Sequence, residues 1–209
     1  FNEPIHIKLN NLPEGFTATE TTILPGEESA AIVLTALDDA QSTPDDKQWQ
    51  IKAPGTAVIN GEDVTREGSL RRITVAERTP DVELTLEPSV VQLAPGGRVD
   101  LTVHVTRNNG FAGRVQINVQ NLPHGVVVAN TGLNGVLVTE AEEKRTFTLL
   151  AEKWVPSMER TMMVTGLPAT RANMRYDYAS NPVQLIVGPP SEREPEKKAP
   201  QQVAQNPEN

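Results

Sequence analysis

Apolar and polar residues alternate in short runs along most of this chain, and turn-forming residues separate the runs. Clear examples are residues 5–9, 82–86 and 99–105. Alternation with a period of two gives an extended strand one apolar face and one polar face. No segment follows the 3.6-residue period of an amphipathic helix over a useful length. The pattern therefore predicts an all-β fold made of many short strands.

One turn motif, Asn-Leu-Pro-x-Gly, occurs twice, at residues 11–15 and 121–125. Each copy follows an alternating segment that opens with a phenylalanine, Phe1 or Phe111. Proline fixes φ and glycine accepts positive φ, so the motif is typical of a chain reversal. Two sets of alternating residues also match, and we predict that both sets face inward: Ile32, Leu34 and Ala36 in one unit, Phe147, Leu149 and Ala151 in the other.

The repeat sets the predicted architecture. About seven short strands in roughly a hundred residues are typical of a two-sheet antiparallel sandwich of the immunoglobulin-like (Ig-like) kind. We therefore predict tandem sandwiches over residues 1–76 and 81–188, with a linker over 77–80. Residues 189–209 are rich in Pro, Glu, Lys and Gln, and a segment of that composition cannot offset its ordering entropy. We expect a disordered C-terminal tail there.

The second unit begins with an N-terminal segment that has no counterpart in the first unit. Residues 81–110 carry two or three predicted strands ahead of Phe111, whereas the given sequence opens with Phe1. One interpretation is that the first unit is N-terminally truncated and belongs to a longer protein, which would leave strand edges unpaired. The other is that the first unit is a shorter sandwich in its own right. The repeat favours the truncated, incomplete first sandwich.

Two strand predictions in the first unit depend on turn chemistry. Residues 48–53 and 57–59 read as separate strands. The second of them leads into Asn60-Gly61, and this dipeptide accepts the left-handed geometry of a tight hairpin turn. We therefore predict a β-hairpin centred on Asn60-Gly61.

Composition and charge exclude several classes of function. The chain has 209 residues, of which only 4% are aromatic, so its cores must be lean and aliphatic. A net charge of -8 argues against a nucleic-acid partner, which needs a basic surface, and against an anionic lipid surface. No apolar run approaches the ~18 residues that cross a membrane, so we expect no membrane insertion. The absence of cysteine excludes disulfides, thiolate metal sites and cysteine nucleophiles.

The sequence offers little support for catalysis or metal binding. No histidine lies in a metal-binding spacing, and we interpret all three as solvent-exposed: His6, His104 and His124. The acidic pairs could supply some calcium ligands, but none follows a calcium-loop pattern, so we interpret them as solvated loop charge: Asp38-Asp39, Asp45-Asp46 and Glu62-Asp63. A Gly-x-Ser-x-Gly elbow is also absent. We predict no catalytic residue, no metal site, no cofactor and no enzymatic activity.

The few aromatic residues are the remaining candidates for ligand contact. Trp154 lies in a predicted loop beside Pro156 and is the most plausible exposed aromatic residue. Tyr176 and Tyr178 share one face of a predicted strand. If that face is the outer one, the pair could form a small binding platform. If the face is inward, both tyrosines belong to the core, which is the interpretation that we favour.

Several motifs of the second unit together carry a family resemblance. They are Leu-Glu-Pro-x-x-Val-x-Leu-Ala-Pro-Gly-Gly from Leu86, Asn-Asn-Gly-Phe-x-Gly-x-Val from Asn108 and Asn-Leu-Pro-x-Gly-Val from Asn121. This pattern resembles the Ig-like repeat domains of large exported and surface proteins of planctomycete-like bacteria. The resemblance covers residues 81–187 well and 1–75 in part. It implies an extracytoplasmic location (periplasm, cell surface or secreted) and carries no catalytic residues.

These observations favour a non-catalytic structural or interaction module, a spacer or adhesion-type repeat of an exported bacterial protein. Its expected partners are neighbouring domains of the same longer chain, and a cell-surface polysaccharide or protein is a further candidate. The alternative is an accessory glycan- or protein-binding module attached to a hydrolase or protease. An exposed aromatic strip at Trp154 or Tyr176 would support the alternative.

Overall fold

The computed structural model describes residues 2–40, 51–70, 73, 75, 79–129, 131, 135–169 and 177–189. All regular structure in these residues is β-strand, which confirms the predicted all-β class. Some predictions fall on Asp45-Asp46, Tyr176 and residues 190–209, and these lie outside the described residues.

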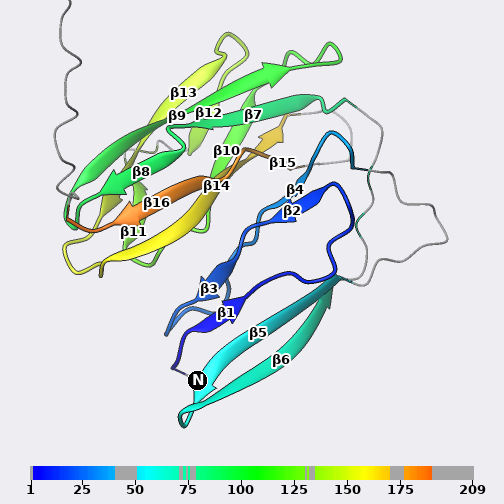
Figure 1. Ribbon diagram of the computed structural model, residues 1–209. Coiled ribbons are helices and arrows are strands. Elements are labelled where there is room, and N and C mark those ends of the chain that lie inside the picture. The colour runs from blue at the N-terminus through cyan, green and yellow to red at the C-terminus, as the bar shows by residue number, and fades with distance from the viewer. Residues whose placement is uncertain are drawn as a thin grey trace, which may run out of the picture.

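Six strands form the first part of the fold, which we call the N-terminal half (Figure 1). They are β1 (Ile5–Ile7), β2 (Phe16–Ala18), β3 (Thr21–Ile23), β4 (Leu34–Ala36), β5 (Ile51–Ile59) and β6 (Glu62–Leu70). One sheet has the order β3-β1-β5-β6, and the other is the pair β2-β4. Every pairing in this half is antiparallel.

The later strands form the C-terminal half. They are β7 (Val82–Glu87), β8 (Val90–Leu93), β9 (Arg98–Arg107), β10 (Val115–Gln120), β11 (Val126–Ala129), β12 (Val136–Val138), β13 (Lys144–Ala151), β14 (Met158–Pro168), β15 (Tyr178–Ala179) and β16 (Val183–Val187). One sheet has the order β12-β10-β14-β16-β8, with β15 beside β14, and the other has the order β11-β13-β9-β7. The two sheets pack as the predicted sandwich.

One pairing between described strands departs from the predicted antiparallel pattern, because β8 runs parallel to β16, and the isolated bridge between Leu84 and Ser180 is parallel as well. After β7 the chain passes Pro88 and crosses from one sheet to the other without reversing its direction. Proline lacks the N–H that would continue the first ladder, so β7 ends there. The same segment therefore contributes to both sheets.

The core of the C-terminal half lies between its two sheets. Val103, Val164 and Leu185 come from different strands, and each is 0% exposed. Full burial of such a side chain stabilises a fold by about 1.5–3 kcal/mol. Alternation continues along each strand, as in the burial of Val82, Leu84 and Leu86 on β7.

The core of the N-terminal half is leaner. Its buried apolar side chains, among the described residues, are Leu9, Phe16, Val33, Ile51 and Ala57. Ile32 and Leu34 are half-buried and Ala36 is exposed, so the predicted inward position of Ala36 is wrong. In the C-terminal half the matching Ala151 is buried because β9 lies beside β13. No described strand lies in that place beside β4.

The two copies of the Asn-Leu-Pro-x-Gly motif have the same backbone conformation. Asn11 and Asn121 have φ angles of 58° and 63°, and Gly15 and Gly125 have φ angles of 79° and 85°. In each copy the residue after glycine donates its N–H to the proline carbonyl, at 3.2 Å in the first and 3.0 Å in the second. The repeat seen in the sequence is therefore a repeat of structure.

The strand pairings extend this correspondence to whole sheets. The order β3-β1-β5-β6 matches β12-β10-β14-β16, and β2-β4 matches β11-β13. The register agrees as well, since Ile7 lies opposite Gly55 on β5 and Ile117 lies opposite Gly166 on β14. Among the described strands of the N-terminal half, none corresponds to β7, β8 or β9. These three strands lie in residues 81–110, the N-terminal segment of the second unit that the sequence showed to have no counterpart in the first.

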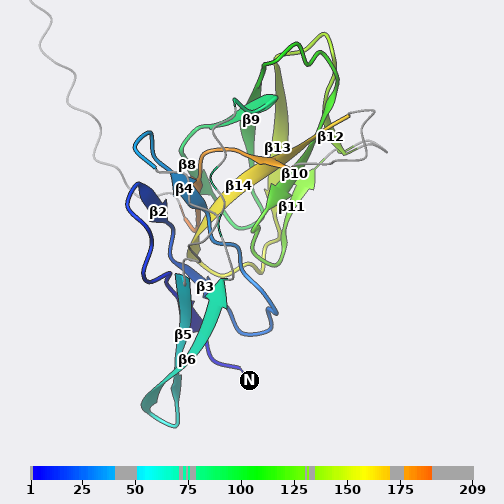
Figure 2. The same cartoon turned by 90° about the vertical axis from the view of Figure 1, so that its right-hand side faces the viewer.

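The predicted hairpin is present between β5 and β6. Asn60 and Gly61 have positive φ angles of 54° and 84°, as a tight hairpin turn requires. The two separate strands expected over 48–53 and 57–59 are wrong, because β5 is continuous from Ile51 to Ile59. Its pairing with β6 runs along this whole length. Figures 1 and 2 show this hairpin extending away from the C-terminal half.

Candidate functional site at the junction of the two halves

A tight turn after β3 presents an acidic side chain to the C-terminal half. Pro25 occupies the second position of the turn, and Gly26 occupies the third with φ of 84°. The Glu27 N–H donates to the Leu24 carbonyl at 2.9 Å, and the Leu24 N–H donates to the Glu27 carboxylate at 3.1 Å. Proline and glycine in these positions are typical of a type II turn. The turn therefore fixes the Glu27 side chain in place.

Arg160 of β14 meets this carboxylate. Its Nη1 and Nη2 atoms donate to the two carboxylate oxygens of Glu27 at 2.8 and 2.7 Å, and Nη2 also donates to the Thr22 carbonyl at 3.4 Å. The side chains of Arg160 and Glu27 are only 6% and 15% exposed. A two-pronged, buried ion pair of this kind fixes direction as well as distance. It joins segments more than a hundred residues apart in the chain.

The ionisation of Glu27 reflects the same contacts. Burial alone would raise the pKa of Glu27, but the hydrogen bonds from Arg160 and from the Leu24 N–H lower it, and the nearby charges of Arg160 and His124 act in the same direction. The balance is a pKa below the ordinary value of a glutamate. Glu27 is therefore a carboxylate at neutral pH, and the ion pair is fully formed.

A second bridge between the halves comes from the turn motif. The Asn121 side-chain oxygen accepts the Ala31 N–H at 3.0 Å. Its amide nitrogen donates to the Thr161 carbonyl at 2.6 Å and to the Ala31 carbonyl at 3.5 Å. Asn121 thus links the end of β10, the start of β14 and the approach to β4. The sequence predicted Asn121 only as part of a turn.

The capped turn that carries Glu27 recurs in the C-terminal half. There the Glu142 carboxylate accepts the Thr139 N–H at 2.9 Å, and the Glu142 N–H donates to the Thr139 carbonyl at 3.1 Å. The arginine partner of Glu142 is Arg145, three residues along the same half, at 3.0 Å. Only the first copy therefore uses its glutamate to hold a different half of the molecule.

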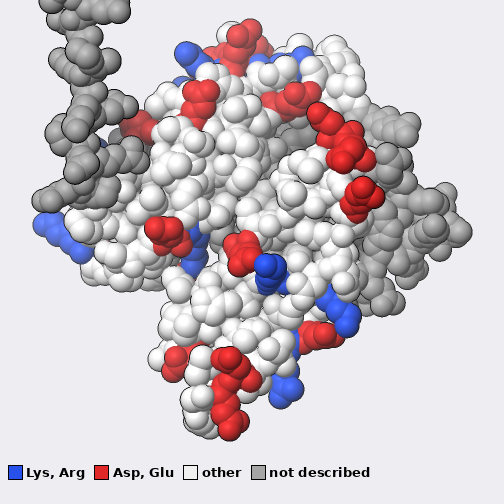
Figure 3. All heavy atoms as spheres, viewed as in Figure 1, with Lys and Arg blue, Asp and Glu red and all other residues white. Residues whose placement is uncertain are grey.

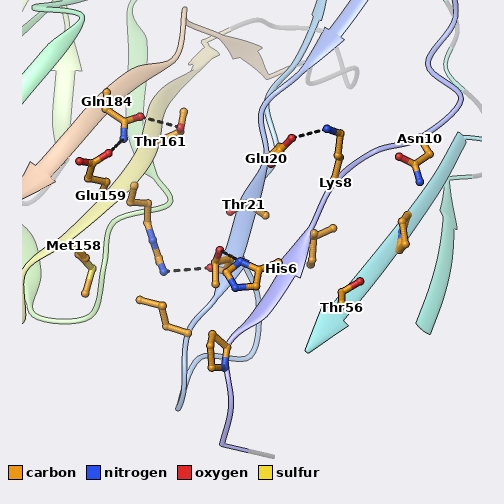
Figure 4. Close-up of a pocket in the computed structure, with 16 residues that line it drawn as sticks. His6, Lys8, Asn10, Glu20, Thr21, Thr56, Met158, Glu159, Thr161 and Gln184 are labelled. Carbon is orange, nitrogen blue, oxygen red and sulfur yellow. Dashed lines mark hydrogen bonds and ion pairs between the residues drawn. The ribbon is translucent and has the colours of Figure 1, made fainter. Parts of the chain in front are cut away.

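A groove of about 800 Å³ lies beside the ion pair, between the outer faces of two sheets. Figure 4 shows His6 of β1 and Lys8, which directly follows β1, on the side of the groove opposite Thr161 and Gln184 of the C-terminal half. Lys8 pairs with Glu20 at 2.8 Å, and the hydrogen bond and charge of Glu20 raise the pKa of Lys8.

The polar groups of this groove bond mainly to one another. His6 Nδ1 lies 2.9 Å from the Thr22 hydroxyl, and the Thr161 hydroxyl donates to Gln184 at 3.3 Å. Thr22 is thus a groove threonine with a hydrogen-bonded histidine, but within the described residues no third side chain bonds to the His6 ring to orient it as a base. The described lining of the groove is therefore a largely polar surface.

An apolar hollow of about 560 Å³ lies close to Glu27. Trp154, in the loop between β13 and β14, is 57% exposed there. The His124 ring lies against it, with ring centroids 5.1 Å apart and planes tilted by 44°. Other parts of the lining come from both halves: Leu24, Pro25, Gly26, Pro156, Ser157 and Met158. The exposed aromatic surface expected at Trp154 is thus found at the junction.

Tyr178, another predicted contact residue, is not part of the lining of this hollow. Tyr178 lies on β15 and packs against the core of the C-terminal half, as the core interpretation expected. It pairs with Gly166, whereas Trp154 precedes the start of β14. Eight residues of strand separate those points, or roughly 25 Å. Tyr176 lies outside the described residues, so no shared platform is defined.

The three histidines lie on different elements of the fold. His6 lies on β1, His124 lies beside Trp154, and His104 on β9 is half-buried with Nε2 at 3.4 Å from Glu87. In the part of the chain that the structure describes, no three His, Asp or Glu side chains are grouped to hold a metal ion.

Acidic side chains are scattered over both halves on the face shown in Figure 3, with Lys and Arg between them. No continuous basic surface is visible on that face, in keeping with the net charge of -8.

None of the described residues forms a helix with the length and hydrophobicity that would span a lipid bilayer.

No protein-family model matches this chain, and no curated protein matches it. Several solved structures are similar in part. Domains 4 and 5 of the S-layer protein SbsC share 14% identity over 88% of this chain and 70% of that chain, with a TM-score of 0.30. Fibronectin(III)-like modules of Clostridium thermocellum CbhA share 11% identity over 90% of this chain and 77% of that chain, with a TM-score of 0.28.

A chain from a structure of T cell activation by the bacterial superantigen toxic shock syndrome toxin-1 is also similar. It shares 15% identity over 51% of this chain and 98% of that chain, with a TM-score of 0.33. Likenesses at this level do not assign a function. The strands and their pairings define an all-β protein with an Ig-like sandwich.

Proposed function

We propose that this chain is a non-catalytic structural module, a spacer that holds its two halves in one mutual orientation. The observation that carries the proposal is the largely buried, two-pronged ion pair between Glu27 and Arg160. Removing one partner of a buried ion pair typically costs about 3–5 kcal/mol, because the other charge is left uncompensated. Bending the junction would have the same effect. The ion pair therefore favours a stiff connection.

Asn121 supports the same proposal from an independent direction. Its side chain bonds to Ala31 in one half and to Thr161 in the other. A hinge would have to break these bonds together with the Glu27–Arg160 pair. A spacer transmits position and force, and both tasks need a junction that resists bending.

The proposal extends to the surroundings in which such a spacer acts. We place it in an exported bacterial protein, outside the cytoplasm, with neighbouring domains of the same longer chain as its first partners. The resemblance of its repeat motifs to Ig-like surface repeats supports this location.

Residual dipolar couplings from the two halves test the stiffness of the junction. In one weakly aligned sample, the N–H couplings of both halves should fit a single alignment tensor. Two tensors of different magnitude would show independent motion and would overturn the spacer proposal. Asn121→Gly serves as a matched variant, because glycine accepts the positive φ of this position and the change removes one bridge while leaving the Glu27–Arg160 pair in place.

The Trp154 hollow favours a second candidate, an accessory module that binds a glycan or a protein. A tryptophan ring that is 57% exposed offers a flat apolar face for a sugar ring or a proline-rich peptide. Soluble cell-wall polysaccharide and a proline-rich peptide are suitable probes, with binding followed by NMR shifts of Trp154 and its neighbours. If this hollow binds either probe, Trp154→Ala should abolish the shifts while Tyr178→Phe keeps them. Absence of shifts with both probes in the unmodified chain would exclude this candidate.

A further inference from the structure

The outer edge of β4 differs from its counterpart in the C-terminal half. β13 is paired on both sides, with β11 and with β9, whereas β4 is paired only with β2 in the described residues. Leu149 and Ala151 on β13 are 0% and 1% exposed. Leu34 and Ala36, which occupy the matching positions on β4, are half-buried and exposed. We attribute this difference in exposure to β9, which lies beside β13. No described strand lies in the corresponding place beside β4.

The backbone of β4 points hydrogen-bond donors toward this edge. The Leu37 N–H donates to the Gly15 carbonyl on the β2 side at 2.7 Å. Because successive N–H groups of a strand point in opposite directions, the Ala36 N–H points away from β2. In the C-terminal half the matching Ala151 N–H donates to the Gly97 carbonyl at 3.1 Å, beside the start of β9. The same donor position is thus used in the C-terminal half, whereas the Ala36 N–H has no acceptor among the described residues.

We propose that the β4 edge is an acceptor site for an extended polypeptide segment of the β9 type. The segment would run antiparallel to β4, with alternating apolar side chains turned toward the core. The register follows from the internal repeat, in which Val99 lies opposite Leu149 and Leu101 lies opposite Phe147. Apolar residues of the incoming strand therefore lie opposite Leu34 and Ile32.

A segment of this kind is favoured because, in the C-terminal half, β9 already pairs in this way with β13, the counterpart of β4. β9 alternates Leu101, Val103 and Val105 inward, and these residues are 1%, 0% and 4% exposed. The N-terminal half repeats the acceptor, including the turn motif and the pairing register, and its core is correspondingly lean. Strand addition of this kind satisfies the open backbone groups and buries apolar surface in one step.

Amide hydrogen exchange on the full chain provides the first arm of the test. The N–H groups of Leu34 and Ala36 should exchange at least about 100-fold faster than those of Leu149 and Ala151, since exchange reports local opening. Equal protection of the two pairs would mean that the β4 edge is already covered, and it would overturn the proposal. Protection that rises with protein concentration would point to a second copy on this edge and would also overturn it.

A fusion provides the second arm. Residues 81–110 are placed a second time directly before Phe1, so that Gly110 meets Phe1 as it meets Phe111 in the natural sequence. The short connection gives a high effective concentration, so that weak affinity is not limiting. Exchange of the Leu34 and Ala36 amides should slow by about 100-fold or more. Unchanged exchange would overturn the proposal.

A matched fusion controls for the chemistry of the segment. It carries Leu101→Asn, Val103→Asn and Val105→Asn in the added copy only, which keeps the length and the backbone donors but removes the apolar face. The β4 amides should then exchange as in the unfused chain. Equal protection by both fusions would show that the apolar alternation plays no part, and it would contradict the proposal.

Discussion

Glu27 combines two roles in one side chain. Its carboxylate caps the turn by accepting the Leu24 N–H, and it also binds both terminal nitrogens of Arg160. Both carboxylate oxygens of Glu27 therefore have hydrogen-bond partners, and no buried side-chain nitrogen or oxygen lacks a partner among the described residues. A buried charge pair with this degree of satisfaction is stabilising only while both members are present.

Replacing Glu27 should be costly. Glu27→Gln leaves the Arg160 guanidinium buried without a counter-charge, and we expect the free energy of unfolding to fall by about 3 kcal/mol in urea denaturation. Glu20→Gln is the matched control, because the Lys8–Glu20 pair is just as short at 2.8 Å but both side chains are 67% exposed. The control should change stability little. Equal effects of the two substitutions would show that burial of the Glu27 pair does not matter.

A paired replacement separates the ion pair from the packing of the junction. Glu27→Leu with Arg160→Met removes both charges and keeps apolar volume, so it should recover most of the loss seen with Glu27→Gln. Urea denaturation of both single variants and the double variant gives the coupling energy. Simple additivity of the two single effects would contradict a direct interaction between these side chains.

The lowered pKa of Glu27 makes the junction sensitive to acid. The unfolded state binds a proton to Glu27 more readily than the folded state does, so the stability from this group is present above the ordinary glutamate pKa of about 4.3 and is lost as pH falls through the lower folded value. The stability difference between the natural chain and Glu27→Gln should therefore shrink between pH 6 and pH 3. A difference that stays constant over this range would contradict the assignment.

At the scale of elements, each of the two turn motifs requires glycine at its last position for two reasons, the backbone conformation and the lack of room for a Cβ atom. Gly15 and Gly125 have positive φ, and an added Cβ would lie 2.5 Å from the Ala40 Cα or 2.6 Å from the Trp154 ring. Gly61 also has positive φ, but nothing lies within 4 Å of an added Cβ there. The same backbone conformation is therefore crowded in two places and open in the third.

Alanine substitution at these glycines should show that difference. Gly61→Ala should cost about 1 kcal/mol, from the positive φ alone. Gly15→Ala and Gly125→Ala should each cost more, because neighbouring atoms must also move. Thermal unfolding followed by circular dichroism measures all three. A loss for Gly61→Ala as large as for the other two would mean that crowding adds nothing at the motif.

The elements that depend on local chemistry were predictable from the sequence. The Asn60-Gly61 hairpin and the repeated Asn-Leu-Pro-x-Gly turns formed as expected, because proline, glycine and asparagine act through their own backbone preferences. The break expected ahead of residue 57 did not form, because pairing of β5 with β6 outweighs the local signal of Pro54 and Gly55. The burial of Ala36 also failed as a prediction, because burial depends on a neighbouring strand rather than on alternation alone.

At the scale of the molecule, the junction could be predicted only in part. Trp154 was singled out as an exposed aromatic residue, and it lies in the junction hollow. Glu27, Arg160 and Asn121 were missed, because residues so far apart in the chain meet only through tertiary packing. Arg160 did carry a signal, since it alternates in phase with the apolar Met162 and Val164 of β14. A charged residue in an inward register predicts a buried partner.

The most direct test of the account is the distance between the halves in solution. The chain has no cysteine, so Asp63→Cys on β6 and Thr106→Cys on β9 provide two specific spin-label positions, both exposed. Pulsed electron paramagnetic resonance should give a single narrow distance distribution at neutral pH, and Glu27→Gln should broaden it. A broad distribution in the otherwise unmodified chain would contradict a fixed junction and the spacer function proposed from it.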